Sequence, residues 1–292
     1  MKNQRTIPSV NFHLWEPCNM RCKFCFATFQ DVKKTILPKG HLSKSKAIAL
    51  VRKMAEFGFE KITFAGGEPT LCPWLIDLIK TAKDLGMTTM IVTNGSKLDL
   101  GKLEIFKSNL DWIALSIDSI KADTNVNIGR AIVGKRAIDL ENYKEIIKRI
   151  KSLGFGLKIN TVVNGFNSNE DMTEFIKFAL PKRWKILQVL TVEGQNDKKI
   201  KRLMVSSKEF QGFVNRHSRL SNITTIIPEA NTDMRGSYAM VDPAGRFFDN
   251  TNGGHSYSEP ILEVGIETAY GQVKIDEFKF TQRGGEYNWS LH

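Results

Sequence analysis

The sequence predicts an α/β protein, an open and partial (β/α)6 barrel followed by a C-terminal extension. Short apolar runs alternate with amphipathic segments six times, a pattern typical of a parallel sheet with right-handed crossovers. Six units are too few for a closed eight-stranded barrel. From about residue 223 the alternation stops, so the last part of the chain is expected to fold differently.

Each βα unit has its own start and stop signals. Six strands are predicted at residues 10–15, 61–65, 88–93, 112–117, 157–163 and 184–192. The first helix is expected to begin at Ser43, whose hydroxyl suits an N-cap, and to end at Gly58. Later helices are predicted between Pro73 and Gly86, at residues 139–153, from Ser168 to residue 180, and at residues 208–220.

The C-terminal part is rich in turn formers over residues 228–254, and a short helix is expected near residues 262–270. We therefore divide the chain into a partial barrel at residues 1–220 and an extension at residues 221–292 that covers the barrel mouth. Active sites of such barrels lie at the carboxyl ends of the strands. A cysteine-containing loop and the turns at residues 66–69 and 94–96 follow predicted strands, so the active site is expected there.

The 292-residue chain is basic, with 42 Lys and Arg against 31 Asp and Glu and a formal net charge of +11. This surplus suits a nucleic acid, an anionic membrane or a phosphorylated small molecule, and it equally suits plain solubility. Residues 1–5 contain no apolar run, so no signal peptide is predicted. No run of about 18 apolar residues would span a membrane, and a cytoplasmic protein is expected.

Three of the four cysteines, Cys18, Cys22 and Cys25, lie in one loop directly after the first predicted strand. In a cytosolic chain, clustered cysteines indicate metal binding more than disulfides. Three thiolates leave a structural zinc site one ligand short, whereas on a [4Fe–4S] cluster they leave one iron open for an outside molecule. The alternatives are a chance cluster or a zinc loop completed by Cys72 or His13. Otherwise Cys72 is expected to be a small buried filler.

Two motifs together suggest a superfamily. Phe24 precedes the last cysteine of the loop, and Gly66–Gly67–Glu68–Pro69 follows the second strand. With these motifs the sequence resembles the radical S-adenosylmethionine (SAM) superfamily. The resemblance implies that the open iron binds SAM, that SAM is cleaved to a 5′-deoxyadenosyl radical, and that Glu68 is the carboxylate partner of the SAM amino group. No cysteine follows Cys72, so a single cluster is expected.

Several predicted strands carry polar side chains where a parallel sheet is usually apolar. Because side chains alternate along a strand, Lys158 and Asn160 share a face, and so do Arg183 and Lys185. Lys61 opens the second strand. A buried lone cation is costly, so the four cations are expected either at solvent-exposed strand ends or around an anion inside the barrel. A triphosphate would satisfy them together through charge-assisted hydrogen bonds.

The same region extends the resemblance to one family. The matching segments are residues 157–164, 166–167, 169–174, 183–185, 188–190, 193–196, 228–229, 237–238, 283–287 and 289–290. Across nearly the whole chain from Val10, the sequence resembles the viperins, which are antiviral radical SAM enzymes. It lacks the N-terminal membrane-binding helix of the animal members, so the resemblance implies a prokaryotic viperin.

The resemblance also assigns roles to residues. Cys18, Cys22 and Cys25 would hold the cluster, and Tyr238 matches the proposed general acid. SAM contacts would come from Phe24, Gly66, Gly67, Glu68, Asn94, Ser116 and Arg130, and nucleotide contacts from Asn11, Lys61, Lys158, Asn160, Arg183 and Lys185. The chain departs from animal viperins at Ala65, where they have Ser, and over residues 249–258, which bear on the base-facing lid. His13 is expected to be either a wall of the site or a packed core residue.

By resemblance, the substrate is CTP, UTP or GTP. The radical would take the C4′ hydrogen, and loss of the 3′-hydroxyl as water with a one-electron reduction would give a 3′-deoxy-3′,4′-didehydro nucleotide, a chain terminator that acts against phage. The expected partners of this monomer are the nucleotide, SAM as co-substrate, and a flavodoxin or ferredoxin as reductant, with no membrane and no direct nucleic-acid partner. Two rival classes are a radical SAM enzyme that modifies RNA or a phosphorylated metabolite, and a non-enzymatic iron or zinc module that binds nucleic acid.

Overall fold

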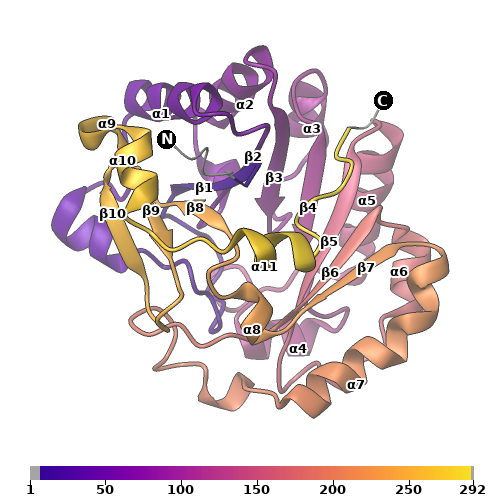
Figure 1. Ribbon diagram of the computed structural model, residues 1–292. Coiled ribbons are helices and arrows are strands. Elements are labelled where there is room, and N and C mark those ends of the chain that lie inside the picture. Colours follow the sequence, from indigo (N-terminus) through magenta and orange to yellow (C-terminus); the bar gives the residue numbers. More distant parts are fainter. Residues whose placement is uncertain (1–6, 291–292) are drawn as a thin grey trace.

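The computed structural model describes residues 7–290, and these residues form one ten-stranded sheet in the order β10-β9-β8-β1-β2-β3-β4-β5-β6-β7 (Figure 1). The first six strands are β1 (Ser9–Trp15), β2 (Lys61–Gly66), β3 (Thr88–Thr93), β4 (Trp112–Ser116), β5 (Gly156–Val163) and β6 (Arg183–Gln188). Each of them pairs in parallel with the next in chain order. The predicted open, parallel α/β barrel is therefore confirmed.

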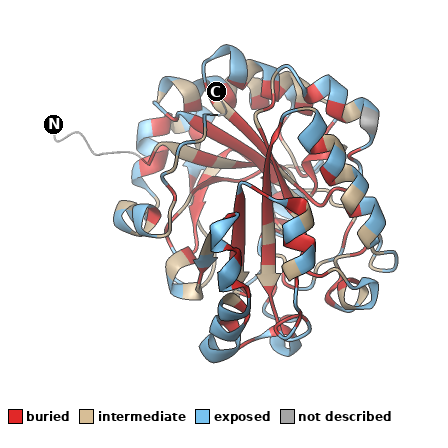
Figure 2. Ribbon diagram, turned by 90° about the vertical axis from the view of Figure 1, so that its right-hand side faces the viewer, coloured by how far each residue is buried: buried red, intermediate tan, exposed pale blue. Residues whose placement is uncertain are grey.

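Helices cover the outer face of these strands (Figure 1). They are α1 (Lys44–Glu56), α2 (Leu75–Asp84), α3 (Leu100–Phe106), α5 (Leu140–Ser152), α6 (Thr173–Ala179) and α7 (Ser207–His217), whereas α4 (Ala122–Ile128) lies beyond the carboxyl ends of the strands. Short 3₁₀ turns lie at Pro69–Leu71, Lys201–Leu203 and Ser218–Asn222, and a π-helical turn lies at Val32–Ile36. The main core forms between helices and sheet, where Phe12, Phe64 and Ile113 are fully buried. Figure 2 shows the same layering, with buried strands beneath helices whose outer sides are exposed.

Two elements are shorter than the apolar pattern predicts. The helix expected from Ser168 begins at Thr173, whose backbone N–H donates to Asp171 Oδ1 at 2.8 Å. The sixth strand was expected to reach residue 192, but it ends at Gln188, and Asn196 Oδ1 accepts a hydrogen bond from Val192 N at 2.9 Å. Asn and Asp side chains that bond nearby backbone compete with regular pairing, which apolar periodicity does not register.

The extension contributes further strands and helices. These are β7 (Thr225–Glu229), β8 (Ala239–Val241), β9 (Arg246–Asp249) and β10 (Ser256–Pro260), with α8 (Asn231–Met234), α9 (Ile261–Val264), α10 (Ile266–Gly271) and α11 (Glu277–Gln282). β7 pairs in parallel with β6, and β8 pairs in parallel with β1, so the extension joins both edges of the predicted six-stranded sheet. The helix expected near residues 262–270 is split at Gly265, whose φ is 85°.

The parallel strands give the sheet two distinct edges, one where the strands start and one where they end. β1 to β6 all finish at the edge where the cysteine loop and the turn after Gly66 emerge, and all start at the opposite edge. Residues 1–5, for which no signal peptide was predicted, lie outside the described residues. None of the helices that the structure describes is both long enough and apolar enough to cross a membrane.

Candidate active site

The cysteine loop follows β1 and is held against the turn that follows β2. A Cβ on Gly67 would overlap the carbonyl oxygens of Glu16 and Pro17, which directly precede Cys18. The backbone N–H of Glu68 donates to Pro17 O at 3.0 Å. Glycine is therefore required at this position because two backbones approach closely, and that approach fixes the start of the cysteine loop on the end of β2.

Glu68 links the ends of β2 and β3. Its buried carboxylate accepts hydrogen bonds from Thr70 N at 3.1 Å and Thr70 Oγ1 at 2.6 Å, from Thr93 Oγ1 at 2.7 Å, and from Asn94 N at 2.8 Å. Asn94 in turn donates through Nδ2 to Asn19 Oδ1 at 3.0 Å. The network brings the predicted SAM-binding residues Glu68 and Asn94 together and ties both to the loop that carries the cysteines.

Arg130 lies beside the same loop and is fixed by a buried carboxylate. Its Nε donates to Asp118 Oδ2 at 2.6 Å, and its guanidinium carbon lies 5.4 Å from the centre of the Phe24 ring. Burial raises the pKa of the Cys22 thiol to about 12, and the Arg130 charge opposes this shift. Two predicted SAM contacts, Arg130 and Phe24, therefore meet next to a predicted cluster ligand.

The three predicted cluster ligands share one environment. Cys18, Cys22 and Cys25 are partly buried free thiols, and each lies within electrostatic reach of the other two. In residues 7–290 no three His, Cys, Asp or Glu side chains are grouped so as to hold a single metal ion. On a [4Fe–4S] cluster each thiolate binds its own iron, so the ligands stand farther apart than around one zinc ion. The donor set fits a cluster with an open iron, and Cys72 is buried in the core as predicted.

Five basic side chains gather on the inner face of the sheet, mostly at the starts of the strands. This basic cluster consists of Lys61, Lys158, Arg183, Lys185 and Arg283. The strand register places Lys158 beside Arg183, and Asn160 beside Lys185. The four cations predicted from the strands are each more than nine-tenths buried. The structure therefore rules out the alternative that they lie in solvent at separate strand ends.

Tyr238 stands at the centre of one half of the basic cluster. Its hydroxyl accepts a hydrogen bond from Lys185 Nζ at 2.8 Å and donates to Glu229 Oε2. Glu229 Oε1 also lies 2.5 Å from Lys185 Nζ and 3.2 Å from Arg283 Nη1, whose guanidinium stacks 3.6 Å from the centre of the Tyr238 ring. Burial raises the pKa of Tyr238 well above its ordinary value, and Arg283 opposes this shift.

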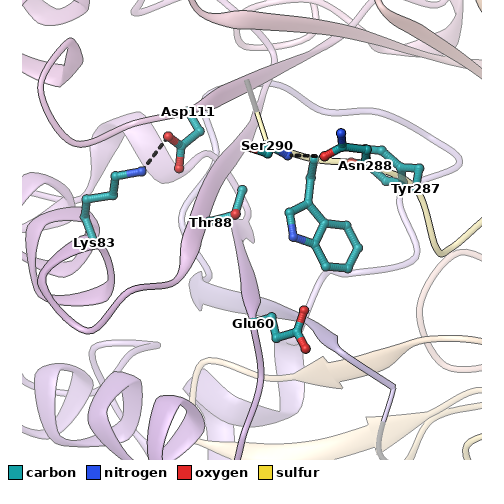
Figure 3. Close-up of a pocket in the computed structure, with 8 residues that line it drawn as sticks. Glu60, Lys83, Thr88, Asp111, Tyr287, Asn288 and Ser290 are labelled. Carbon is teal, nitrogen blue, oxygen red and sulfur yellow. Dashed lines mark hydrogen bonds and ion pairs between the residues drawn. The ribbon is translucent and has the colours of Figure 1, made fainter. Parts of the chain in front are cut away.

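Residues 287–289 close the other half of the cluster at the starts of the strands. Lys61 Nζ donates to the Tyr287 hydroxyl at 2.6 Å, and Arg183 stacks 3.8 Å from the centre of the same ring. Trp112 Nε1 donates to Trp289 O at 2.8 Å. Figure 3 shows this tail beside a pocket of about 380 Å³, whose lining also includes Glu60, Lys83, Thr88 and Asp111. Three of these precede or open β2, β3 and β4, so the tail covers the end of the barrel opposite the cysteine loop.

Lys158 is the exception within the basic cluster. None of the described residues accepts a hydrogen bond from its ammonium group, although it is only 7% exposed. Burial, and then the neighbouring charges of Lys185 and Lys61, lower the pKa of Lys158 well below its ordinary value. Asn160, two residues along β5, has a buried Oδ1 that is unpaired within the described chain. Both groups are the kind that a bound polar anion would satisfy.

The basic cluster should make the stability of the protein rise with pH. Burial, and then Lys185 and Arg183, lower the pKa of Lys61 to about 7. Because the unfolded chain keeps this lysine protonated up to its ordinary pKa near 10.5, the unfolded state binds more protons above pH 7. Lys61 alone should increase the free energy of unfolding by about 1 kcal/mol between pH 7 and pH 8, measured by urea denaturation, and the lowered pKa values of Lys185 and Lys158 add to the rise. Lys61→Met should reduce the rise by about that amount, and an equal rise in that variant would contradict the assignment.

The remaining predicted residues lie on the inner face between the two ends. Asn11 pairs in register with Thr63 of β2, and Ser116 pairs with Asn160. His13 is 5% exposed and packs edge-on among three phenylalanine rings, which agrees with the second of the two roles expected for it, a packed core residue. Burial lowers the pKa of His13 to about 3, which keeps its ring neutral.

Three residues of the site carried no role in the sequence analysis, namely Glu229, Arg283 and Tyr287. All three lie in the extension, where the βα alternation has stopped and therefore does not predict which residues face the interior. A usable signal existed for Glu229, because an acid at the end of an apolar run, residues 225–228, needs a buried cation as a partner. The segment 283–287 was recognised only as part of the family resemblance.

Comparison with known proteins defines the class first. Residues 15–179 match the model of the Radical SAM superfamily. The fold is similar to that of anSMEcpe with bound AdoMet, with a TM-score of 0.70 and 14% identity over 90% of this chain and 80% of that one. It is also similar to Streptococcus suis SuiB bound to S-adenosylmethionine, with a TM-score of 0.69 and 15% identity over 96% and 68%. The fold and the cysteine loop thus define a radical SAM enzyme with a [4Fe–4S] cluster and SAM.

Full-length relatives define the family. A protein of Flammeovirga pacifica named S-adenosylmethionine-dependent nucleotide dehydratase is 56% identical over 97% of this chain and 96% of its own length. One of the same name from Lacinutrix mariniflava is 58% identical over 98% of this chain, which spans only 60% of that relative. A third, from Oncorhynchus mykiss, is 36% identical over 98% and 81%. The chain belongs to this family of nucleotide dehydratases, the viperins.

Proposed function

We propose that the protein dehydrates a ribonucleoside triphosphate, CTP, UTP or GTP, to its 3′-deoxy-3′,4′-didehydro form, a chain terminator used in defence against phage. The observation that carries the proposal is the basic cluster. Five cations gather inside the barrel around one carboxylate, Glu229, and the ammonium group of Lys158 forms no hydrogen bond or ion pair with the described residues. A triphosphate supplies several negative charges and many acceptor oxygens, so it would neutralise the group and satisfy Lys158.

Strand geometry supports a lengthwise position for the nucleotide. Lys61 opens β2 and Gly66 ends it, so the basic cluster and the SAM turn are separated by five residues of one strand. At about 3.3 Å per residue this is roughly 16 Å. A triphosphate held at the start of the strand would bring its ribose toward the end where SAM is expected. Asn11 and Asn160 lie along the intervening inner face, beside the expected path of the sugar.

The reaction divides between the bound groups and the chain. When bound, the cluster and SAM supply the radical that removes the C4′ hydrogen and the chemistry of one-electron transfer. The basic cluster holds the triphosphate, which places one ribose hydrogen within reach. Tyr238 donates a proton to the departing 3′-hydroxyl, which leaves as water. Lys185 and Arg283, which already contact Tyr238, stabilise the tyrosinate that remains.

We further propose that residues 221–292 are an extension that completes the nucleotide site, because Glu229, Tyr238, Arg283 and Tyr287 all belong to it. An external flavodoxin or ferredoxin supplies electrons. We also propose that the protein acts as a monomer, since each of these side chains comes from the one chain.

An anaerobic competition assay tests the proposal. Reconstituted protein, SAM and a chemical reductant are mixed with equimolar CTP, UTP, GTP and ATP, and the products are identified by mass spectrometry. We expect one nucleotide to lose the mass of one water as 5′-deoxyadenosine accumulates. Formation of 5′-deoxyadenosine with all four nucleotides unchanged would contradict the proposed substrate class, and RNA would then be tested first.

Tyr238→Phe is expected to separate SAM cleavage from product formation. Phenylalanine keeps the ring beneath Arg283 but removes the hydroxyl that we propose as the general acid. Loss of a general acid typically slows a reaction by about 10² to 10⁴-fold. We therefore expect the dehydrated nucleotide to fall by at least about 10²-fold, while nucleotide-stimulated release of 5′-deoxyadenosine continues. Tyr270→Phe, in α10 of the core, serves as the control and should retain full activity. Product formation within a few-fold of wild type in Tyr238→Phe would contradict the assignment.

A further inference from the structure

The outer side of the cysteine loop is backed by residues 128–137. Arg21 N donates to Gly129 O at 3.1 Å, and Lys23 N donates to Ile128 O at 2.9 Å. A Cβ on Gly129 would overlap the carbonyl oxygen of Arg21, so the two backbones touch without a side chain between them. This segment and the cysteine loop therefore present one continuous surface.

That surface has an apolar tip with a basic rim. We name it the loop face, and it consists of Arg21, Lys23, Val133, Lys135 and Arg136, all of them exposed. Val133 is 66% exposed and has a φ of 52°, a left-handed conformation that a β-branched residue rarely adopts. Its backbone N–H donates to Asn19 O at 2.8 Å. Contact with the cysteine loop thus holds an apolar side chain out in solvent.

The cations of the loop face have no acidic partner, although Arg21 donates hydrogen bonds to Cys18 O and Met20 O and Lys23 donates one to Asn127 O. None of its four cations forms an ion pair with a carboxylate of residues 7–290. On helix α5, by contrast, Lys144 lies 2.7 Å from Glu141, and Lys148 lies 2.6 Å from Glu145. An apolar centre surrounded by unpaired charges of one sign is suited to a protein surface of the opposite sign.

We propose that the loop face docks a small acidic electron-transfer protein that reduces the [4Fe–4S] cluster. Cys22 lies between Arg21 and Lys23 in the sequence, and a Cβ on Gly129 would lie 3.2 Å from Cys22 Cα, so the loop face adjoins a cluster ligand. Apart from the three loop cysteines the chain has only Cys72, so no second cluster of this chain relays electrons from another surface. In the transfer the carrier loses one electron, the cluster gains one, and no bond forms or breaks. The inference rests on the cluster and is independent of which nucleotide is the substrate.

Binding and cluster reduction test the proposal without any nucleotide. A purified acidic flavodoxin is titrated onto reconstituted wild-type protein, Lys135→Glu/Arg136→Glu and Val133→Asp, and its Kd is measured at low and high salt. Stopped-flow bleaching of the cluster is then followed with reduced flavodoxin and separately with dithionite. Lys46→Glu/Arg52→Glu, an equal charge reversal on exposed positions of α1, is the matched control.

We expect both loop-face variants to raise the Kd and to slow flavodoxin-driven bleaching by about tenfold or more at low salt, because both place negative charge against an acidic partner. High salt should weaken wild-type binding toward the level of the variants. The control variant should behave as wild type, and dithionite should reduce all four proteins equally. Unchanged binding in both loop-face variants, an equal loss in the control, or a matching loss with dithionite would each overturn the proposal.

Discussion

Cys22→Ala is expected to lose the [4Fe–4S] cluster and, with it, all cleavage of SAM. Two thiols, Cys18 and Cys25, remain in the loop and leave the cluster one protein ligand short of the three that hold it. The loop itself should keep its shape, because backbone contacts from Arg21 and Lys23 and the close approach at Gly67 hold it. We therefore expect iron and sulfide at background levels and no detectable 5′-deoxyadenosine, in a protein that still folds.

Cys72→Ala is the matched control for the loss of one thiol. Cys72 is 5% exposed and packs in the core, so its loss should cost about 1 kcal/mol of stability and leave the iron content and SAM cleavage unchanged. Iron and sulfide analysis, the circular dichroism spectrum and a SAM cleavage assay distinguish the two variants. Persistent SAM cleavage by purified Cys22→Ala, or equal loss of iron in both variants, would contradict the three-cysteine assignment.

The parallel strands were predictable because their local signals agree. In β2 to β5 an apolar run ends at glycine, asparagine or a polar residue, and each observed boundary lies within one residue of the prediction. The strands of the extension carry weaker signals. β8 has three residues, which is too short to establish a period, and β7 contains Pro228, which argues against a central strand but is tolerated at the edge where β7 lies.

The site residues on the parallel strands were likewise predictable, whereas those in the extension were not. The cost of burying a cation indicated that Lys61, Lys158, Arg183 and Lys185 belong together, since an interior polar residue is informative at any strand position. The sequence analysis assigned no role to Glu229 and Arg283 because their partners are distant in sequence: Arg283 lies 54 residues from Glu229. Only the pairing of β8 with β1 and of β7 with β6 brings Tyr238 and Glu229 toward the interior. Local sequence patterns do not predict such pairing between distant strands.

As the proposed nucleotide site, the basic cluster also illustrates how residues suited to binding oppose stability. Arg183 has partners in the free protein, Gly284 O at 2.8 Å and the ring of Tyr287, so it contributes to the fold as well as to any ligand. Lys158 lacks such partners among the described residues, and its lowered pKa reflects the unfavourable burial of its charge. The two residues are adjacent on neighbouring strands, yet their removal should change stability in opposite directions.

Lys158→Met is accordingly expected to stabilise the free protein and to impair nucleotide binding. Methionine fills a similar volume without a charge, and replacing buried ionic groups by apolar side chains of similar volume is neutral to stabilising, by up to about 4 kcal/mol for a buried ion pair. The same change removes a charge-assisted hydrogen bond to the phosphates, worth about 1.5 to 3 kcal/mol, so the Kd for the nucleotide should rise by roughly 10 to 100-fold. SAM binding and basal SAM cleavage should persist, because Lys158 lies toward the start of β5, away from the cysteine loop.

Urea denaturation and calorimetric titration with CTP, UTP and GTP measure the two effects on one preparation. Arg183→Ala should lose both stability and nucleotide affinity, and Lys151→Met, on an exposed position of α5, should change neither. A lower unfolding free energy in Lys158→Met would show that the lysine has a favourable partner in the free protein. The phosphate role is inferred because four cations converge on the inner face of three strands. Unchanged nucleotide affinity in both Lys158→Met and Arg183→Ala would contradict that role.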